Sequence, residues 1–187
     1  MILKKLISFV TVILILSAWI PPRASGQEAQ IKDILITTRG YQVLVYARVT
    51  NCFTKDMEAA IMAGVPTTFT FLLNLYQQRS GWPDKKISDS VITRTVKYDS
   101  VKKTFYVSSS LDRDPVLFQD LESAKRAMSE FNGSIALPSD LRKDRPHYVM
   151  MMAKMDKIRL PLYMEYVFFF VSLWDFETAW YRQPVVF

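Results

Sequence analysis

The side chains best suited to catalysis in this sequence are one histidine and a pair of aspartates. His147 has no neighbouring nucleophile motif, although a histidine-based triad needs a nucleophile and an orienting carboxylate beside the ring. Asp112 and Asp114 lie in a segment typical of an exposed turn, where paired carboxylates stay solvated. Gly-x-Ser-x-Gly, Gly-rich phosphate-loop and His-Glu-x-x-His motifs are absent. The sequence therefore predicts no catalytic residue.

The sulfur-containing side chains could in principle bind a metal, because thioethers are ligands for copper(I). The spacing of the methionines argues against a copper site. In a strand Met150 and Met152 lie on one face and Met151 and Met155 on the other, so the sulfurs do not converge on one ion. Cys52 is the only cysteine and cannot form an internal disulfide, so we expect it to be a buried small hydrophobe. We expect no metal and no other cofactor.

The N-terminus has the pattern of a secretory signal peptide. Lys4 and Lys5 precede an apolar run from Leu6 to Leu16, and the small residues of Ala24-Ser25-Gly26 suit cleavage before Gln27. No cysteine directly follows the apolar run, so a lipid anchor is not expected.

These features predict a signal peptide at residues 1–26 and a single exported β-rich domain at residues 27–187, located in the periplasm. The alternative is an inner-membrane anchor that is not cleaved. Residues 6–20 give that anchor 15 residues, whereas a spanning helix needs about 20.

The composition of the exported part suits one packed domain with a mild positive charge. Cleavage would leave 161 residues and would lower the net charge from +6 to +3, because Lys4, Lys5 and Arg23 leave with the signal. That excess is too small and too dispersed for nucleic-acid binding, and export also argues against it. It is compatible with anionic lipid headgroups or an acidic partner.

Alternation of polar and apolar side chains predicts a series of antiparallel strands. The expected strands cover residues 34–37 and 41–49, which form a hairpin, and then residues 67–78, 87–98, 104–107, 147–158 and 174–182. Residues 163–173 are apolar enough for either a buried strand or a buried helix.

Two short helices are predicted between these strands. The first begins at Thr54 and is stopped by Gly64. The second is capped by Asp120, carries Phe131 on its apolar face and ends at Gly133. The expected fold is mainly β (α+β), an antiparallel β-sandwich-like domain with two short helices.

Exposed aromatic and basic residues are the candidates for partner contact, namely Trp82, Tyr163, Lys102 and Lys103. Solvated loops explain the lysines most simply. The functional alternative is contact with a membrane surface or with an acidic partner.

Several segments occur in an order that is typical of one protein family. They are residues 59–66 with Phe69, residues 79–82, residues 96–98 with 105–107, residues 118–121 with Ala124, residues 159–162, and Trp174 with Trp180-Tyr181. Together these segments resemble a bacterial envelope family known as domain of unknown function 4390. The resemblance implies an exported, mainly β domain without an established activity. Genes of the family often lie beside a membrane sensor histidine kinase, which suggests a signalling or envelope partner.

We therefore expect a non-enzymatic interaction module of the cell envelope, accessory to a membrane sensor kinase or to another membrane or envelope protein. The alternatives are a periplasmic carrier of an apolar ligand, and an enzyme of unrecognised type. The sequence does not define an oligomeric state.

Overall fold

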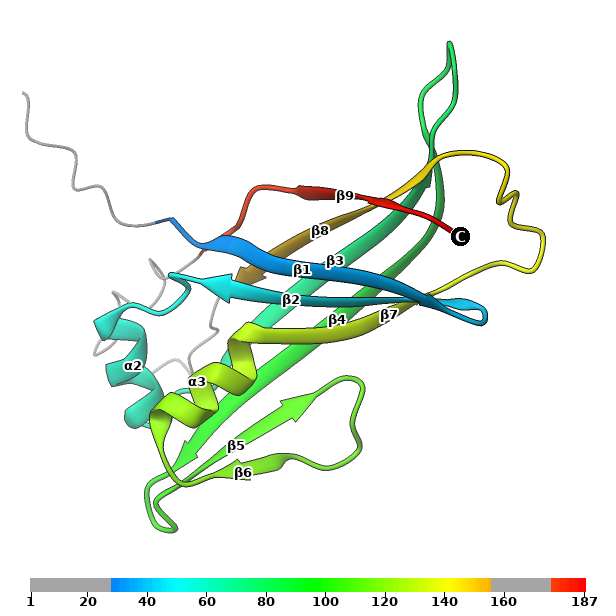
Figure 1. Ribbon diagram of the computed structural model, residues 1–187. Helices are drawn as coiled ribbons and strands as arrows, with labels where there is room; N and C mark the ends of the chain where they lie inside the picture. The colour runs from blue at the N-terminus through cyan, green and yellow to red at the C-terminus, as the bar shows by residue number, and fades with distance from the viewer. Residues whose placement is uncertain (1–27, 156–175) are drawn as a thin grey trace, which may run out of the picture.

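Two antiparallel sheets and two helices make up the part of the chain that the computed structural model describes, residues 28–155 and 176–187 (Figure 1). The strands are β1 (Gln30–Arg39), β2 (Gln42–Thr50), β3 (Thr67–Gln77), β4 (Lys85–Asp99), β5 (Thr104–Ser109), β6 (Val116–Phe118), β7 (Glu130–Ala136), β8 (His147–Met155) and β9 (Tyr181–Val185). The helices are α2 (Lys55–Met62) and α3 (Leu121–Ser129).

The smaller sheet has the strand order β1-β2-β7, and the larger sheet has the order β6-β5-β4-β3-β8-β9. Each pairing is antiparallel, which suits strands that are joined mostly by short turns. This arrangement confirms the predicted α+β, sandwich-like fold.

The core lies between the two sheets and follows from the period of two along each strand. On β3, Phe69, Phe71, Leu73 and Leu75 are fully buried, as the alternation predicted. The ring of Phe71 meets that of Phe131 from β7 with centroids 4.7 Å apart, so the two sheets are in direct contact. Burying each such side chain contributes about 1.5–3 kcal/mol.

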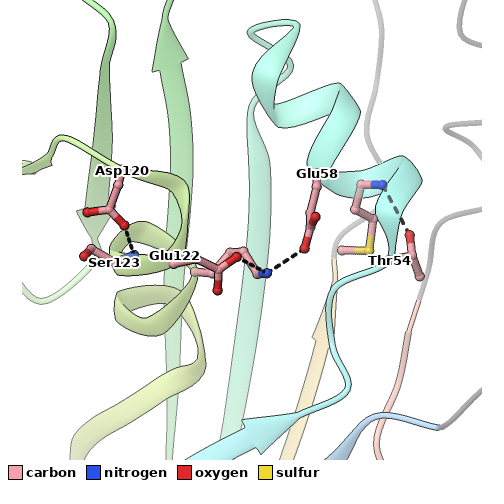
Figure 2. Close-up of polar contacts among 7 residues, drawn as sticks. Thr54, Glu58, Asp120, Glu122 and Ser123 are labelled. Carbon is pink, nitrogen blue, oxygen red and sulfur yellow. Dashed lines mark hydrogen bonds and ion pairs between the residues drawn. The ribbon is translucent and has the colours of Figure 1, made fainter.

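Side-chain caps begin both helices as predicted. Thr54 Oγ1 accepts a hydrogen bond from the Met57 backbone N–H at 3.2 Å, and Asp120 Oδ1 accepts one from Ser123 N–H at 2.8 Å (Figure 2). Gly64 follows α2 with a φ of +86°, a left-handed conformation that glycine adopts without steric cost.

The two helices are joined by an ion-pair network. Lys125 Nζ on α3 lies 2.6 Å from Glu58 Oε1 on α2 and 2.8 Å from Glu122 Oε1 on its own helix. Figure 2 shows the carboxylates of Glu58 and Glu122 directed toward this shared partner. The network connects α2, which links the two sheets, to α3, which leads into β7.

The predicted end of the second helix is wrong. The helix stops at Ser129, and Phe131 and Gly133 lie on β7, where they pair with Ala47 and Val45 of β2. Glu130 already has extended backbone angles, φ −82° and ψ 108°. Pairing with β2 places Phe131 and Ile135 in the core, and this burial outweighs one further helical turn.

The strand predicted at residues 174–182 is also displaced. Residues 174 and 175 lie outside the described residues, and β9 begins at Tyr181. Before it, Thr178 binds β8 through both its backbone and its side chain, because its Oγ1 accepts from Ala153 N–H at 3.0 Å. The Thr178 side chain therefore accepts a hydrogen bond that a backbone carbonyl would accept in a regular antiparallel strand pair. Strands β6 and β7 were not predicted. Tyr163 lies outside the described residues.

The 15-residue strand β4 separates two ends of the molecule (Figure 1). The helix end comprises α2, the turn between β4 and β5, and α3, with the strand residues and cap that adjoin them, residues 55–62, 97–104 and 120–130. The Trp82 end comprises the loops between β1 and β2, between β3 and β4, and between β7 and β8, with the strand residues that adjoin the first two loops, residues 39–42, 78–86 and 137–146. No helix in the described part is both long and apolar enough to cross a membrane.

Candidate functional site

The residues predicted to contact a partner do not form one surface. Trp82 lies in the loop before β4 with 76% of its surface exposed, and Lys102 and Lys103 lie in the turn after β4. Since a strand rises about 3.3 Å per residue, these positions are roughly 45 Å apart along β4. A single partner of ordinary size would contact one group or the other.

Hydrogen bonds to Asp84 hold the loop that carries Trp82 in place. Asp84 Oδ1 accepts a hydrogen bond from Arg79 N–H at 3.1 Å, and Asp84 Oδ2 accepts one from the Tyr148 hydroxyl at 2.8 Å. These two hydrogen bonds, chiefly the one from Tyr148, hold the pKa of the Asp84 carboxyl below its usual value. The guanidinium of Arg182 lies 3.7 Å from the centroid of the Tyr148 ring. Trp82 is therefore exposed on an ordered base.

Backbone hydrogen bonds connect the loops of the Trp82 end at their bases. Leu137 N–H donates to Tyr41 C=O at 2.8 Å, which links the loop after β7 to the turn after β1. Gln78 N–H donates to Pro146 C=O at 2.9 Å, which links the first residue of the Trp82 loop to the residue before β8. The loop between β7 and β8 is thus tied at its two ends to the other two loops.

The Trp82 end is rich in positive charge and exposed aromatic surface. Tyr41 is 73% exposed, and Trp82 is 76% exposed. The basic side chains of its three segments are Arg39, Arg79, Lys85, Lys86, Arg142, Lys143 and Arg145, and the acidic ones are Asp84, Asp140 and Asp144. The basic groups outnumber the acidic ones by more than two to one, and all ten side chains belong to exposed residues.

The helix end lacks this imbalance. Its basic side chains are Lys55, Lys97, Lys102, Lys103, Lys125 and Arg126, and they are matched in number by Asp56, Glu58, Asp99, Asp120, Glu122 and Glu130. At the turn itself, Asp99 Oδ1 accepts hydrogen bonds from the N–H groups of Val101 and Lys102, each at 3.0 Å. Lys102 also lies 5.9 Å from the centroid of the Tyr106 ring. The lysines predicted as contacts therefore lie in a locally balanced field.

A cleft of about 550 Å³ lies between β7 and the β5–β6 hairpin, and Arg94 and Arg48 line it together with Asp33, Asp112 and Glu130. Arg94 stands on the core-facing side of β4, between Ile92 and Val96. Its guanidinium donates to the carbonyls of Ala127 and Glu130 and to Asn132 Oδ1. Burial lowers the pKa of Arg94, while Asp112 and Glu130 act in the opposite direction.

The partners of Arg94 indicate a structural role. Ala127 and Glu130 belong to the last turn of α3 and its C-cap, where carbonyls lack helical partners. Arg94 therefore joins the larger sheet to the end of α3 and the start of β7. Sequence reasoning did not single it out, although its alternation with Ile92 and Val96 was a usable signal.

The candidates for catalysis do not assemble within the described residues. Asp112 and Asp114 are both exposed, as a solvated turn requires. The described residues hold no group of three or more metal-ligating His, Cys, Asp or Glu side chains. Burial raises the pKa of the Cys52 thiol to about 12, so the thiolate is not formed at neutral pH. Met151, Met152 and Met155 are buried in β8, which confirms their role in packing.

His147 is 3% exposed, and neither of its ring nitrogens has a hydrogen-bond partner among the described residues. Its ring packs edge-on against Phe187 with centroids 5.1 Å apart. Burial lowers the pKa of His147 below its ordinary value of 6.5, although the Arg145 backbone and Asp144 favour the charged form. Burial therefore favours the neutral form of the ring.

This burial predicts a pH-dependent stability. In the unfolded chain His147 takes up a proton near pH 6.5, whereas the folded state resists protonation, so the stability that it contributes is present above pH 6.5 and lost as the pH falls below it. Urea unfolding at pH 7.5 and pH 5 should show this loss in the wild type and a smaller loss in His147→Leu. An equal loss in both proteins would contradict the prediction.

A family model described as "Domain of unknown function (DUF4390)" matches residues 26–184. Neither the curated proteins nor the solved structures contain a match.

Proposed function

The chain belongs to the DUF4390 family, and from that premise we propose that it is an exported, non-enzymatic interaction module that binds at the membrane surface of the cell envelope through its Trp82 end. The observation that carries this proposal is an exposed tryptophan on a loop held by hydrogen bonds, at an end of the molecule where basic side chains outnumber acidic ones.

Export is supported by the leader pattern of residues 1–26 and by the position of the first strand, since β1 begins at Gln30, shortly after the proposed cleavage site. A membrane-proximal partner suits an exported domain with this charge distribution, because exposed basic groups attract anionic surfaces over about a Debye length. A membrane sensor kinase, the partner that the family resemblance suggests, would lie at the same membrane surface.

Binding is favoured over catalysis and over transport of an apolar ligand. Asp112 and Asp114 are exposed, whereas Cys52 and His147 are both buried. The lining of the cleft around Arg94 is mixed, with five charged side chains beside apolar ones such as Phe118 and Phe131. Sites for apolar ligands are lined mainly by apolar side chains.

The proposal predicts that membrane association in cells depends on Trp82. After crosslinking of whole cells, the wild-type chain should be recovered with the membranes, and Trp82→Ala should shift most of it to the soluble fraction. Val101→Ala is the matched control, because Val101 is 90% exposed at the opposite end of β4.

The recovered protein should begin at Gln27, which would show that no retained N-terminal anchor accounts for its association. A wild-type chain that stays soluble, or a loss caused by Val101→Ala instead of Trp82→Ala, would contradict the proposed function.

A further inference from the structure

We infer that the Trp82 end binds an anionic phospholipid bilayer directly, with the Trp82 side chain in the headgroup region and the basic groups of this end over the lipid phosphates. This inference rests on the proposed function and names the chemistry of the partner at the same site.

The shape of the loop supports a lipid surface. The β3–β4 loop projects beyond the rest of the Trp82 end (Figure 1), and Trp82 is at 76% the most exposed aromatic residue in the described part of the chain. Tryptophan favours the interface between water and lipid, because its ring is apolar and its N–H can remain hydrogen-bonded. The brace through Asp84 and Tyr148 means that little conformational entropy is lost when the loop binds.

The distribution of the charges supports the same partner. The basic residues belong to three segments that lie apart in the sequence, at residues 39–42, 78–86 and 137–146, and none of them lines the cleft around Arg94. Recognition of an acidic protein segment typically uses charges and aromatic anchors buried at the centre of an interface. An anionic bilayer is a broad field that attracts each exposed Lys or Arg separately, so dispersed charges are sufficient.

The carboxylates at this end leave much of the positive charge uncompensated. Asp84 already accepts two hydrogen bonds, and Asp144 lies 3.6 Å from Arg142. Arg39, Lys85, Lys143 and Arg145 have no ion-pair partner within the described residues. They remain available to lipid phosphates.

Two adjacent lysines at each end of β4 provide a matched test. Binding of the purified protein is measured by co-sedimentation with vesicles of equal parts phosphatidylglycerol and phosphatidylcholine, and with vesicles of phosphatidylcholine alone. Lys85→Glu/Lys86→Glu and Lys102→Glu/Lys103→Glu change the net charge equally, so a difference between them reports on position and not on total charge. Circular dichroism confirms that each variant is folded.

The wild type should bind the anionic vesicles and release them as salt is raised, and it should bind phosphatidylcholine weakly. Lys85→Glu/Lys86→Glu should weaken binding by about thirtyfold or more, the loss that two lysines near an anionic surface would produce. Lys102→Glu/Lys103→Glu should change it by less than about threefold. Trp82→Ala should weaken binding, whereas Trp180→Ala, at a position 42% exposed, should not.

Three results would overturn the inference: no binding of the wild type to anionic vesicles, equal losses from the two lysine pairs, or unchanged binding of Trp82→Ala. If vesicle binding fails while membrane association in cells still depends on Trp82, a membrane protein is the partner and the proposed function stands. If association in cells fails, the proposed function itself is wrong.

Discussion

Replacing Arg94 with methionine is expected to lower the free energy of unfolding by about 3 kcal/mol. Methionine keeps the length of the side chain but donates no hydrogen bond, so the carbonyls of Ala127 and Glu130 and the side chain of Asn132 lose their shared donor. These acceptors lie where α3 passes into β7, at the junction of the two sheets. Equilibrium urea unfolding of the purified protein measures the change.

Arg48→Met is the control for this prediction, because Arg48 lines the same cleft and carries the same charge. Its side chain is 53% exposed, and its ion pairs with Asp33 and Glu130 are both 3.5 Å long, so its loss should cost about 0–1 kcal/mol. Arg94→Lys should fall between the two, since an ammonium cannot reproduce the geometry of a guanidinium. Equal effects of Arg94→Met and Arg48→Met would show that Arg94 does not join the sheets.

Gly133→Ala is expected to destabilise the protein by about 2 kcal/mol, although alanine is normally the better residue in a strand. A Cβ atom at position 133 would lie 2.5 Å from Ile92 Cδ1 and 2.5 Å from Phe131 Cζ, well inside van der Waals contact. The absence of a side chain at Gly133 therefore allows the sheets to approach. Thermal or urea unfolding measures the cost, and Ser134→Ala on the same strand should change stability by less than about 0.5 kcal/mol.

A second substitution identifies the cause of that cost. Ile92→Val removes the Cδ1 atom and should destabilise the wild type by about 0.5–1.5 kcal/mol. In the Gly133→Ala background the same change should cost less or even stabilise, because it relieves one of the two close contacts. Strictly additive effects would mean that position 133 does not meet Ile92.

The regular strands and the helix starts were predictable because each depends on local patterns. The alternation along β3 is uninterrupted, and Thr54 and Asp120 occupy cap positions whose chemistry acts within three residues. The end of α3 was not predictable in the same way. Phe131 continues the helical spacing of Ala124 and Met128, so only the pairing with β2, distant in sequence, decides that it lies in a strand.

The candidate site was predicted in part. Trp82 and the lysine pair at 102–103 were identified as exposed, but they were treated as one contact surface. They lie in consecutive turns of a meander, and consecutive turns lie at opposite ends of the strand between them. The brace of Trp82 was beyond sequence reasoning, because Asp84 and Tyr148 are far apart in the chain and meet only through the pairing of β3 with β8.

Site-specific photocrosslinking in cells tests most directly whether the Trp82 end is the binding surface. The reactive group is placed at position 82 in one variant and at position 101 in another. Both positions are highly exposed, and they lie at opposite ends of β4. We predict that position 82 forms adducts with membrane lipid or with a membrane protein and that position 101 does not. Adducts at position 101 without adducts at position 82 would contradict the assignment of the Trp82 end as the binding surface.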